Sequence, residues 1–180
     1  MSDNENLEII KKFIFNKLER DIYNGFAQPS LDKLKNLILF FIDKCGRIYQ
    51  TKLNKLLFYT DFYSFKTNGI AITGLTYTMT DYGPTPQCHH WLYEKSFKEI
   101  KPYNSIIGYH TKTELTAIVK PDLSVFSENE IQIMNHIYST LGQLSGYKIA
   151  SLDFKDDSWK AKIGHDNLLD FSYAFSLKAI

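Results

Sequence analysis

The chain of 180 residues has a mass of 20.9 kDa and an ordinary globular composition, with 44% hydrophobic and 23% charged residues, which predicts one compact unit and excludes a disordered protein. Its 21 basic and 20 acidic residues leave a net charge of +1, so the chain lacks the positive field that draws proteins onto nucleic acid or acidic membranes. Nucleic-acid binding is disfavoured further because Arg20 and Arg47 are the only arginines, the side chains best suited to phosphate recognition.

The two cysteines and the first ten residues indicate in which compartment of the cell the protein acts. Cys45 and Cys88 lie far apart in the sequence, and residues 1–10 are polar and acidic, unlike a secretory signal. We therefore expect reduced thiols and a cytoplasmic protein. The longest apolar run, 37–42, is far shorter than the roughly 20 residues of a membrane span, so no membrane is expected.

The first 68 residues predict three amphipathic helices before any strand. Apolar residues at helical spacing place these helices over 7–23, 31–45 and 51–68. Ser30 stands where an N-cap of the second helix is expected, and Gly46 and Gly69 stand just past the ends of the second and third helices. In the third helix, Leu53, Leu56 and Leu57 are expected in the core.

After Gly69 the residues become β-branched and aromatic, which predicts a strand over 75–80. Because Pro84 has no N–H for a ladder, we expect the Tyr82-Gly83-Pro84 segment to leave the sheet as a fixed bend. Further elements are expected as a short helix over 87–94, strands over 105–108 and 114–119 around a turn at 110–112, a helix that begins with a capping box at Ser127 and Glu130, and a last helix over 168–177.

These elements define the expected fold class. The chain is predicted to be α+β and mainly α-helical, a compact helical domain with a small antiparallel β-sheet of about three strands.

Candidate catalytic groups are few. The adjacent Cys88, His89 and His90 form a metal-like cluster, but their spacing fails the usual zinc patterns. Asp156, with Asp153 and Asp157, could supply paired carboxylates, yet no second acidic pair or phosphate-binding loop accompanies them, which favours a solvated turn. We therefore expect a protein that is not an enzyme, with no cofactor and no metal.

The aromatic residues are more informative. Tyrosine and tryptophan combine a large contact area with a polar tip and are enriched where one protein binds another. Their other interpretation is the hydrophobic core, which we favour for Phe58, Phe62 and Trp159. For Tyr82, which the Gly83-Pro84 bend is expected to hold rigidly, core and interface are nearly balanced, and a rigid bend loses little entropy on binding.

Several of these segments together resemble a known family. Residues 52–62 (KLNKLLFYTDF), 72–77 (ITGLTY) and 82–86 (YGPTP) are similar to the core signature of the Panacea domain, also described as the SocA-like antitoxin domain or the phage-associated GepA-like family. Trp159-Lys160 after the Asp156 loop, followed by 169–174 (LDFSYA), is similar to the family's tryptophan motif and closing helix. The resemblance implies a Panacea domain over 31–180, packed as one unit, with an N-terminal helical extension over 1–30.

The resemblance also implies a function. Members of the family neutralise toxins by direct protein contact, and one hands its toxin to a protease, so occlusion and delivery both stay open here. The family's His-Glu-Glu type of triplet is Phe154-Lys155-Asp156 in this chain, so the role of that histidine does not transfer. The candidate partner-binding residues are Tyr77, Asp81, Tyr82, Gly83, Pro84, Asp156 and Trp159.

The expected partner is a cognate toxin or another protein target, and a homo-oligomer is left open. One alternative is a phage or mobile-element inhibitor of a host defence protein. Another is a nucleic-acid-binding regulator that uses residues 1–68, where 11 basic residues face 8 acidic ones.

Overall fold

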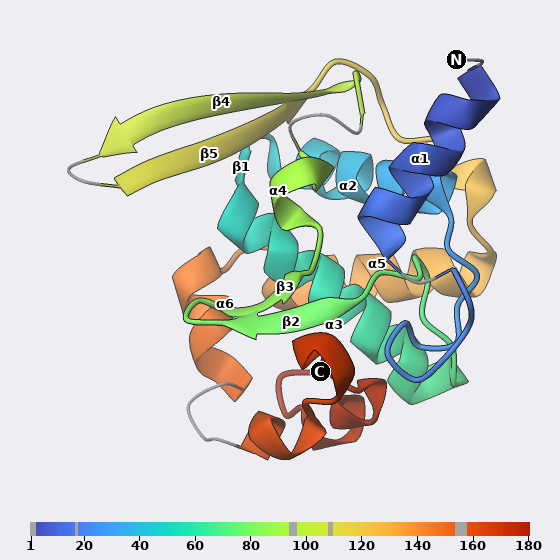
Figure 1. The fold of residues 1–180 in the computed structure, drawn as a ribbon. Coiled ribbons are helices and arrows are strands. Elements are labelled where there is room, and N and C mark those ends of the chain that lie inside the picture. Colours follow the sequence, from blue (N-terminus) through green and yellow to red (C-terminus); the bar gives the residue numbers. More distant parts are fainter. Residues whose placement is uncertain (1–2, 17, 94–96, 108–109, 154–157) are drawn as a thin grey trace.

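The computed structural model describes residues 3–16, 18–93, 97–107, 110–153 and 158–180 (Figure 1). Helices dominate, with two small antiparallel sheets, so the prediction of a mainly α-helical α+β fold is confirmed. The α-helices are α1 (Asp3–Phe15), α2 (Leu31–Cys45), α3 (Gln50–Asn68), α4 (His89–Leu92), α5 (Glu128–Leu141) and α6 (Gly146–Asp153). The strands are β1 (Ile48–Tyr49), β2 (Tyr77–Thr80), β3 (Gly83–Pro86), β4 (Ile100–Ile107) and β5 (His110–Ala117), and the 3₁₀ turns are η1 (Leu123–Val125), η2 (Ser158–Lys162), η3 (His165–Asn167) and η4 (Phe171–Ser176).

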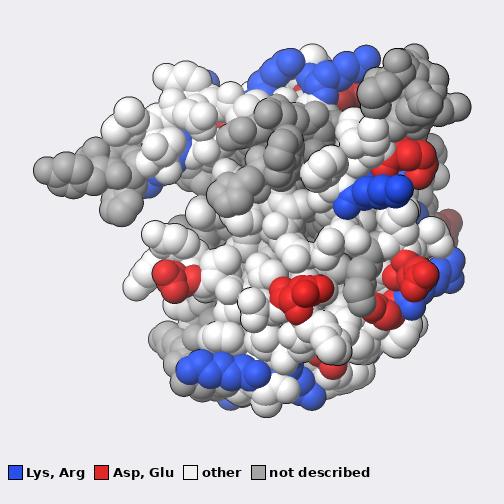
Figure 2. Space-filling view, in the orientation of Figure 1, with Lys and Arg blue, Asp and Glu red and all other residues white. Residues whose placement is uncertain are grey.

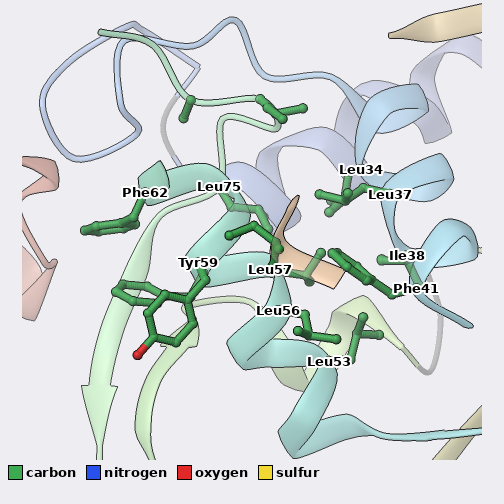
Figure 3. Close-up of a cluster of buried hydrophobic side chains, with 14 of the residues drawn as sticks. Leu34, Leu37, Ile38, Phe41, Leu53, Leu56, Leu57, Tyr59, Phe62 and Leu75 are labelled. Atoms are coloured by element: carbon green, nitrogen blue, oxygen red, sulfur yellow. The ribbon is translucent and has the colours of Figure 1, made fainter. Parts of the chain in front are cut away.

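Helix α3 runs through the centre of the molecule. It contacts α2, α5, α6, β3 and η4, and this is why residues on nearly every side of it are buried. The predicted core positions Leu53, Leu56 and Leu57 are fully buried, so that prediction is confirmed. Figure 3 shows these leucines facing the apolar side chains of α2, among them Leu34, Leu37, Ile38 and Phe41.

The predicted helix ends follow from cap chemistry. The Ser30 hydroxyl accepts the Lys33 N–H at 3.3 Å at the start of α2. At the end of α3, Gly69 takes the left-handed conformation with φ +75°. The capping box of α5 is present in both directions, because the Ser127 N–H donates to the Glu130 carboxylate and the Glu130 N–H donates to the Ser127 hydroxyl. Local side-chain chemistry thus sets the ends of these helices.

Other boundaries were predicted wrongly in the N-terminal part. Helix α1 ends at Phe15 instead of residue 23, because Asn16 takes a left-handed conformation with φ +54°. Three helices do not precede every strand, since β1 lies between α2 and α3 and pairs with β5, with Ile48 opposite Leu115. A two-residue strand whose partner lies more than 60 residues away leaves no local pattern to recognise.

The later elements also differ from the expectation. The predicted turn at 110–112 belongs to β5, which pairs with β4 over its whole length from His110 to Ala117. The expected last helix is shorter and is a 3₁₀ helix, η4, which begins after the Asp170 side chain accepts the Ser172 N–H. Helix α6 was not predicted, and the expected helix over 87–94 is only the single turn α4.

The two sheets are separate. One has the strand order β1-β5-β4, and its β4–β5 hairpin extends away from the helices as an arm (Figure 1). The other is the β2–β3 hairpin, which packs on α3. The strand predicted over 75–80 therefore belongs to this second sheet and not to the three-stranded one.

Candidate partner-binding hairpin

The β2–β3 hairpin carries most of the predicted site residues. Its register places Thr80 opposite Gly83, Met79 opposite Pro84 and Tyr77 opposite Pro86, which leaves Asp81 and Tyr82 as the turn. Gly83 has φ +85°, whereas neither turn residue has a positive φ. The position after the turn favours glycine because other residues are strained at that φ.

The expectation that Pro84 leaves the sheet was wrong, and the hydrogen-bond pattern explains why. The Gln87 N–H donates to the Thr76 carbonyl at 3.0 Å, and hydrogen-bonded pairs alternate along an antiparallel ladder. Pro84 and Pro86 therefore occupy positions whose backbone groups point away from β2, where no N–H is needed. A proline-containing segment can form a strand in this phase.

The turn is fixed by side-chain hydrogen bonds. The Thr80 hydroxyl donates to the Gly83 carbonyl at 2.9 Å and accepts the Tyr82 N–H at 3.2 Å. The Thr85 hydroxyl donates to the same Gly83 carbonyl at 3.2 Å. Above these contacts the Tyr82 side chain is 68% exposed, and Asp81 is exposed beside it. The hairpin therefore presents an aromatic and a carboxylate on an ordered turn.

Lys55 of α3 holds β3 from beneath. Its ammonium donates to the Pro84 carbonyl at 2.7 Å, and the side chain is buried. The carbonyl is available because Pro84 directs its backbone away from β2. Burial lowers the pKa of Lys55 from 10.5 to about 7, because the charged form loses its hydration.

Asp61, two turns further along α3, holds the segment that leads into β2. Its carboxylate accepts the N–H groups of Ile72 and Thr73, both at 2.9 Å, and the Thr73 hydroxyl at 2.5 Å. It also accepts the Tyr77 hydroxyl at 2.8 Å. Burial raises the pKa of Asp61, and these four hydrogen bonds act in the opposite direction. Lys55 and Asp61 thus attach the hairpin and its approach segment to the central helix.

Tyr77 is part of this support. It is fully buried, its ring meets Phe58 and Phe62 edge-on with centroids 5.6 and 5.8 Å away, and its hydroxyl binds Asp61. Burial and the nearby Asp61 carboxylate raise its pKa well above the usual value. Tyr77 lies in the core and offers no surface to a partner in this conformation.

The other predicted residues lie in two places. Gly83 and Pro84 are buried under the turn, and only Asp81 and Tyr82 are exposed there. Trp159 lies on η2, half-buried against the core, with the Lys160 ammonium 5.8 Å from its ring centroid. Asp156 lies outside the described residues. The C-terminal segment joins the hairpin through a bridge between Thr78 and Leu168.

Sequence reasoning missed Lys55 and Asp61. A signal was present, because both polar residues stand in a helical segment whose other residues are mostly apolar on every face. A charged residue in such a surrounding is expected to have a dedicated partner. The buried Asn54 of the same helix was missed as well. Its amide oxygen accepts the Tyr93 hydroxyl at 2.6 Å.

Two further observations concern the described residues. No group of three or more His, Cys, Asp or Glu side chains among them is arranged to hold a metal ion. None of the helices in the described part of the chain combines the length and apolar character that crossing a membrane requires.

The fold and this hairpin define a mainly helical α+β domain built around one central helix with buried polar anchors. Comparison with known families places it more closely: residues 53–160 match the family model described as "Antitoxin SocA-like, Panacea domain". The chain belongs to this family, as its sequence motifs predicted. The match begins in α3 and ends in η2, so it contains the hairpin, the arm, α5 and α6. No curated protein and no solved structure was found to match the chain.

Proposed function

We propose that this protein neutralises a toxin or another protein target by binding it directly, that it acts in the cytoplasm and that it makes or breaks no covalent bond. Membership of the SocA-like antitoxin family supports a protein partner. The nearly balanced charge, +1 overall, supports recognition by contact in preference to recognition of a phosphate backbone.

The observation that carries the proposal is the exposed Tyr82 on an ordered turn. Tyr82 is 68% exposed, so a partner that covers its ring gains hydrophobic free energy. Here the turn beneath it is fixed by Thr80 and Gly83, and the strand after it is held by Lys55. Little conformational entropy is then lost when a partner covers the ring.

The proposed mechanism is occlusion. Tyr82 would enter a recess on the target, and Asp81 would supply a hydrogen-bond acceptor or a charge partner at the rim. Tyrosines at such positions often contribute 2 kcal/mol or more, by rough estimate, to an interface. The target's active face would be blocked without any chemical change.

The family resemblance implies that the toxin is encoded beside this chain, so co-expression with the product of the neighbouring reading frame tests the proposal. We expect growth arrest caused by that product to be relieved by this chain, and the two proteins to elute together in size-exclusion chromatography. An immunoblot of the neighbouring product separates occlusion, which leaves its amount unchanged, from delivery to a protease, which lowers it. Persistent arrest with separate elution would contradict the proposal.

A further inference from the structure

The β4 strand has an edge that no described strand covers. The sheet order β1-β5-β4 places β4 on the outside, so one side of this eight-residue strand pairs with β5 and the other does not pair. Figure 2 shows that the arm projects clear of the body of the molecule. Ile106 is 81% exposed and Tyr103 is 66% exposed. A long strand edge of this kind is a template for another strand.

The hydrogen-bond phase shows which backbone groups point outward. The Ile118 N–H donates to the Glu99 carbonyl at 3.1 Å, just before the first residue pair of the β4–β5 ladder. Because bonded pairs alternate, Asn104 and Ile106 direct their N–H and C=O groups away from β5. Pro102 shares this phase, so its missing N–H breaks no bond to β5, and its carbonyl points outward. The edge therefore presents donors and acceptors at regular spacing.

The sheet face that borders this edge carries a net positive charge, with Lys101 on the edge strand itself. Lys101 of β4 and Lys112 of β5 lie on the same sheet face as Tyr103, since the pairs Lys101–Thr116, Tyr103–Glu114 and Ser105–Lys112 follow at two-residue intervals. Glu114 on this face already lies 3.6 Å from the Arg47 guanidinium. Within the described residues neither lysine has an ion pair. The Lys112 ammonium lies 5.8 Å from the centroid of the Tyr49 ring, on the β1 side of β5, so Lys101 is the lysine that borders the open edge.

We propose that β4 binds an extended acidic segment of the protein partner, which adds to the sheet as a further strand. Main-chain hydrogen bonds to Asn104 and Ile106 would hold the segment. Acidic side chains would face Lys101, and apolar side chains on the opposite face of the sheet would cover the exposed Ile106. The proposal rests on the proposed function in one respect, namely that the partner is a protein.

A second copy of the chain fits this edge less well. In an edge-to-edge dimer each copy would bring its own Lys101 to the same seam, where like charges repel. Each copy would also contribute a Pro102, which offers no N–H to the other strand. An acidic segment from another protein avoids the repulsion and brings no second proline to the seam.

The test uses the full chain labelled with ¹⁵N and a short synthetic peptide of alternating glutamate and valine. We expect the peptide to shift the amide resonances of Asn104 and Ile106 and to protect these amides from hydrogen exchange. A control peptide with lysine in place of glutamate should bind at least about tenfold more weakly, since it places like charges together.

Two variants and one control locate the binding. Ile106→Pro removes an outward N–H without removing a bond to β5, and it should weaken peptide binding about tenfold. Lys101→Glu keeps the strand intact and should weaken binding about fivefold or more, with a smaller dependence on salt. Lys12→Glu, at an exposed position of α1 outside the β1-β5-β4 sheet, should leave binding unchanged. Unchanged amide resonances in α3 will show that each variant is folded.

Several results would overturn the proposal: equal binding of the lysine peptide, shifts confined to other elements, or unaltered binding by both edge variants. Edge shifts that depend on protein concentration without peptide would assign the edge to a second copy and would also overturn it. Failure of the co-expression test would count against the proposed function and not against the edge, because the peptide experiment needs no toxin.

Discussion

Replacing Lys55 by methionine should change how the stability of the folded protein depends on pH. Lys55 is buried, donates to the Pro84 carbonyl and has a pKa lowered from 10.5 to about 7. Between these two values the unfolded chain binds a proton at Lys55 that the folded chain has released. The free energy of unfolding must therefore rise with pH in this range.

The magnitude follows from the two pKa values. Between pH 7.0 and 8.5 the folded lysine goes from half to almost fully neutral, while the unfolded lysine stays charged. Integration of the linkage relation gives a gain of about 1.5 kcal/mol over this interval. The interval ends before the cysteine range because burial raises the pKa of Cys88 from 9.0 to about 12, which makes stability fall at higher pH.

Urea denaturation at several values of pH measures this gain directly. The wild type minus Lys55→Met difference removes the contributions of the other titrating groups, including Asp61, whose raised pKa makes stability fall as pH rises. Lys148→Met, at an exposed position on α6, is the matched control and should keep the wild-type slope. If the wild type and Lys55→Met show parallel curves between pH 7.0 and 8.5, Lys55 does not release its proton in the folded protein.

Three further substitutions test the support of the hairpin, each by urea denaturation at pH 7. Asp61→Ala leaves four buried donors without their acceptor and should lower the free energy of unfolding by at least about 3 kcal/mol. Asp61→Asn keeps an acceptor and should lower it clearly less. Equal losses of stability would contradict the hydrogen-bond explanation. Leu57→Ala should lower the free energy of unfolding by about 2 to 5 kcal/mol, because the side chain is fully buried in the core. A loss of stability below about 1 kcal/mol would show that Leu57 does not pack in the core. Gly83→Val should lower the free energy of unfolding by about 1 to 2 kcal/mol, because φ at this residue is +85°. It should also shift the amide resonances of β2 and β3. Unchanged hairpin resonances would show that the turn does not require glycine.

The sequence predicts the helices well where periodicity and caps agree. Ser30 and Gly46 delimit α2, and the reciprocal Ser127–Glu130 bonds begin α5, because these interactions are local. It fails at α1, where the apolar spacing continues at Leu18 and Ile22 but the chain turns at Asn16. After that turn Ile22 packs against the core from a loop while Leu18 is exposed, and periodicity alone does not distinguish a helix from such a loop.

The hairpin shows a different limit. A proline is incompatible with one hydrogen-bond phase of a strand and compatible with the other, and the phase depends on which residues form the turn. Residue types alone did not place the turn at Asp81 and Tyr82, so Pro84 was expected outside the sheet. The register in the structure resolves this.

The candidate site was predicted in part. The turn residues were found because Gly83-Pro84 was expected to hold Tyr82 in a rigid bend, but the sequence could not separate exposed Tyr82 from buried Tyr77, five residues earlier. Their exposure depends on α3, whose Asp61 draws the Tyr77 hydroxyl inward. Lys55 and Asp61 act through contacts 11 to 29 residues away in the sequence, which no local pattern records.

Isothermal titration calorimetry of Tyr82→Ala against the purified product of the neighbouring reading frame tests the proposed binding surface most directly. Tyr147→Ala is the matched control, because this tyrosine on α6 is even more exposed, at 87%. We expect Tyr82→Ala to weaken binding by about 2 kcal/mol, roughly thirtyfold in Kd, and Tyr147→Ala to leave it unchanged. Equal affinity of the wild type and Tyr82→Ala would show that the hairpin turn is not where the partner binds.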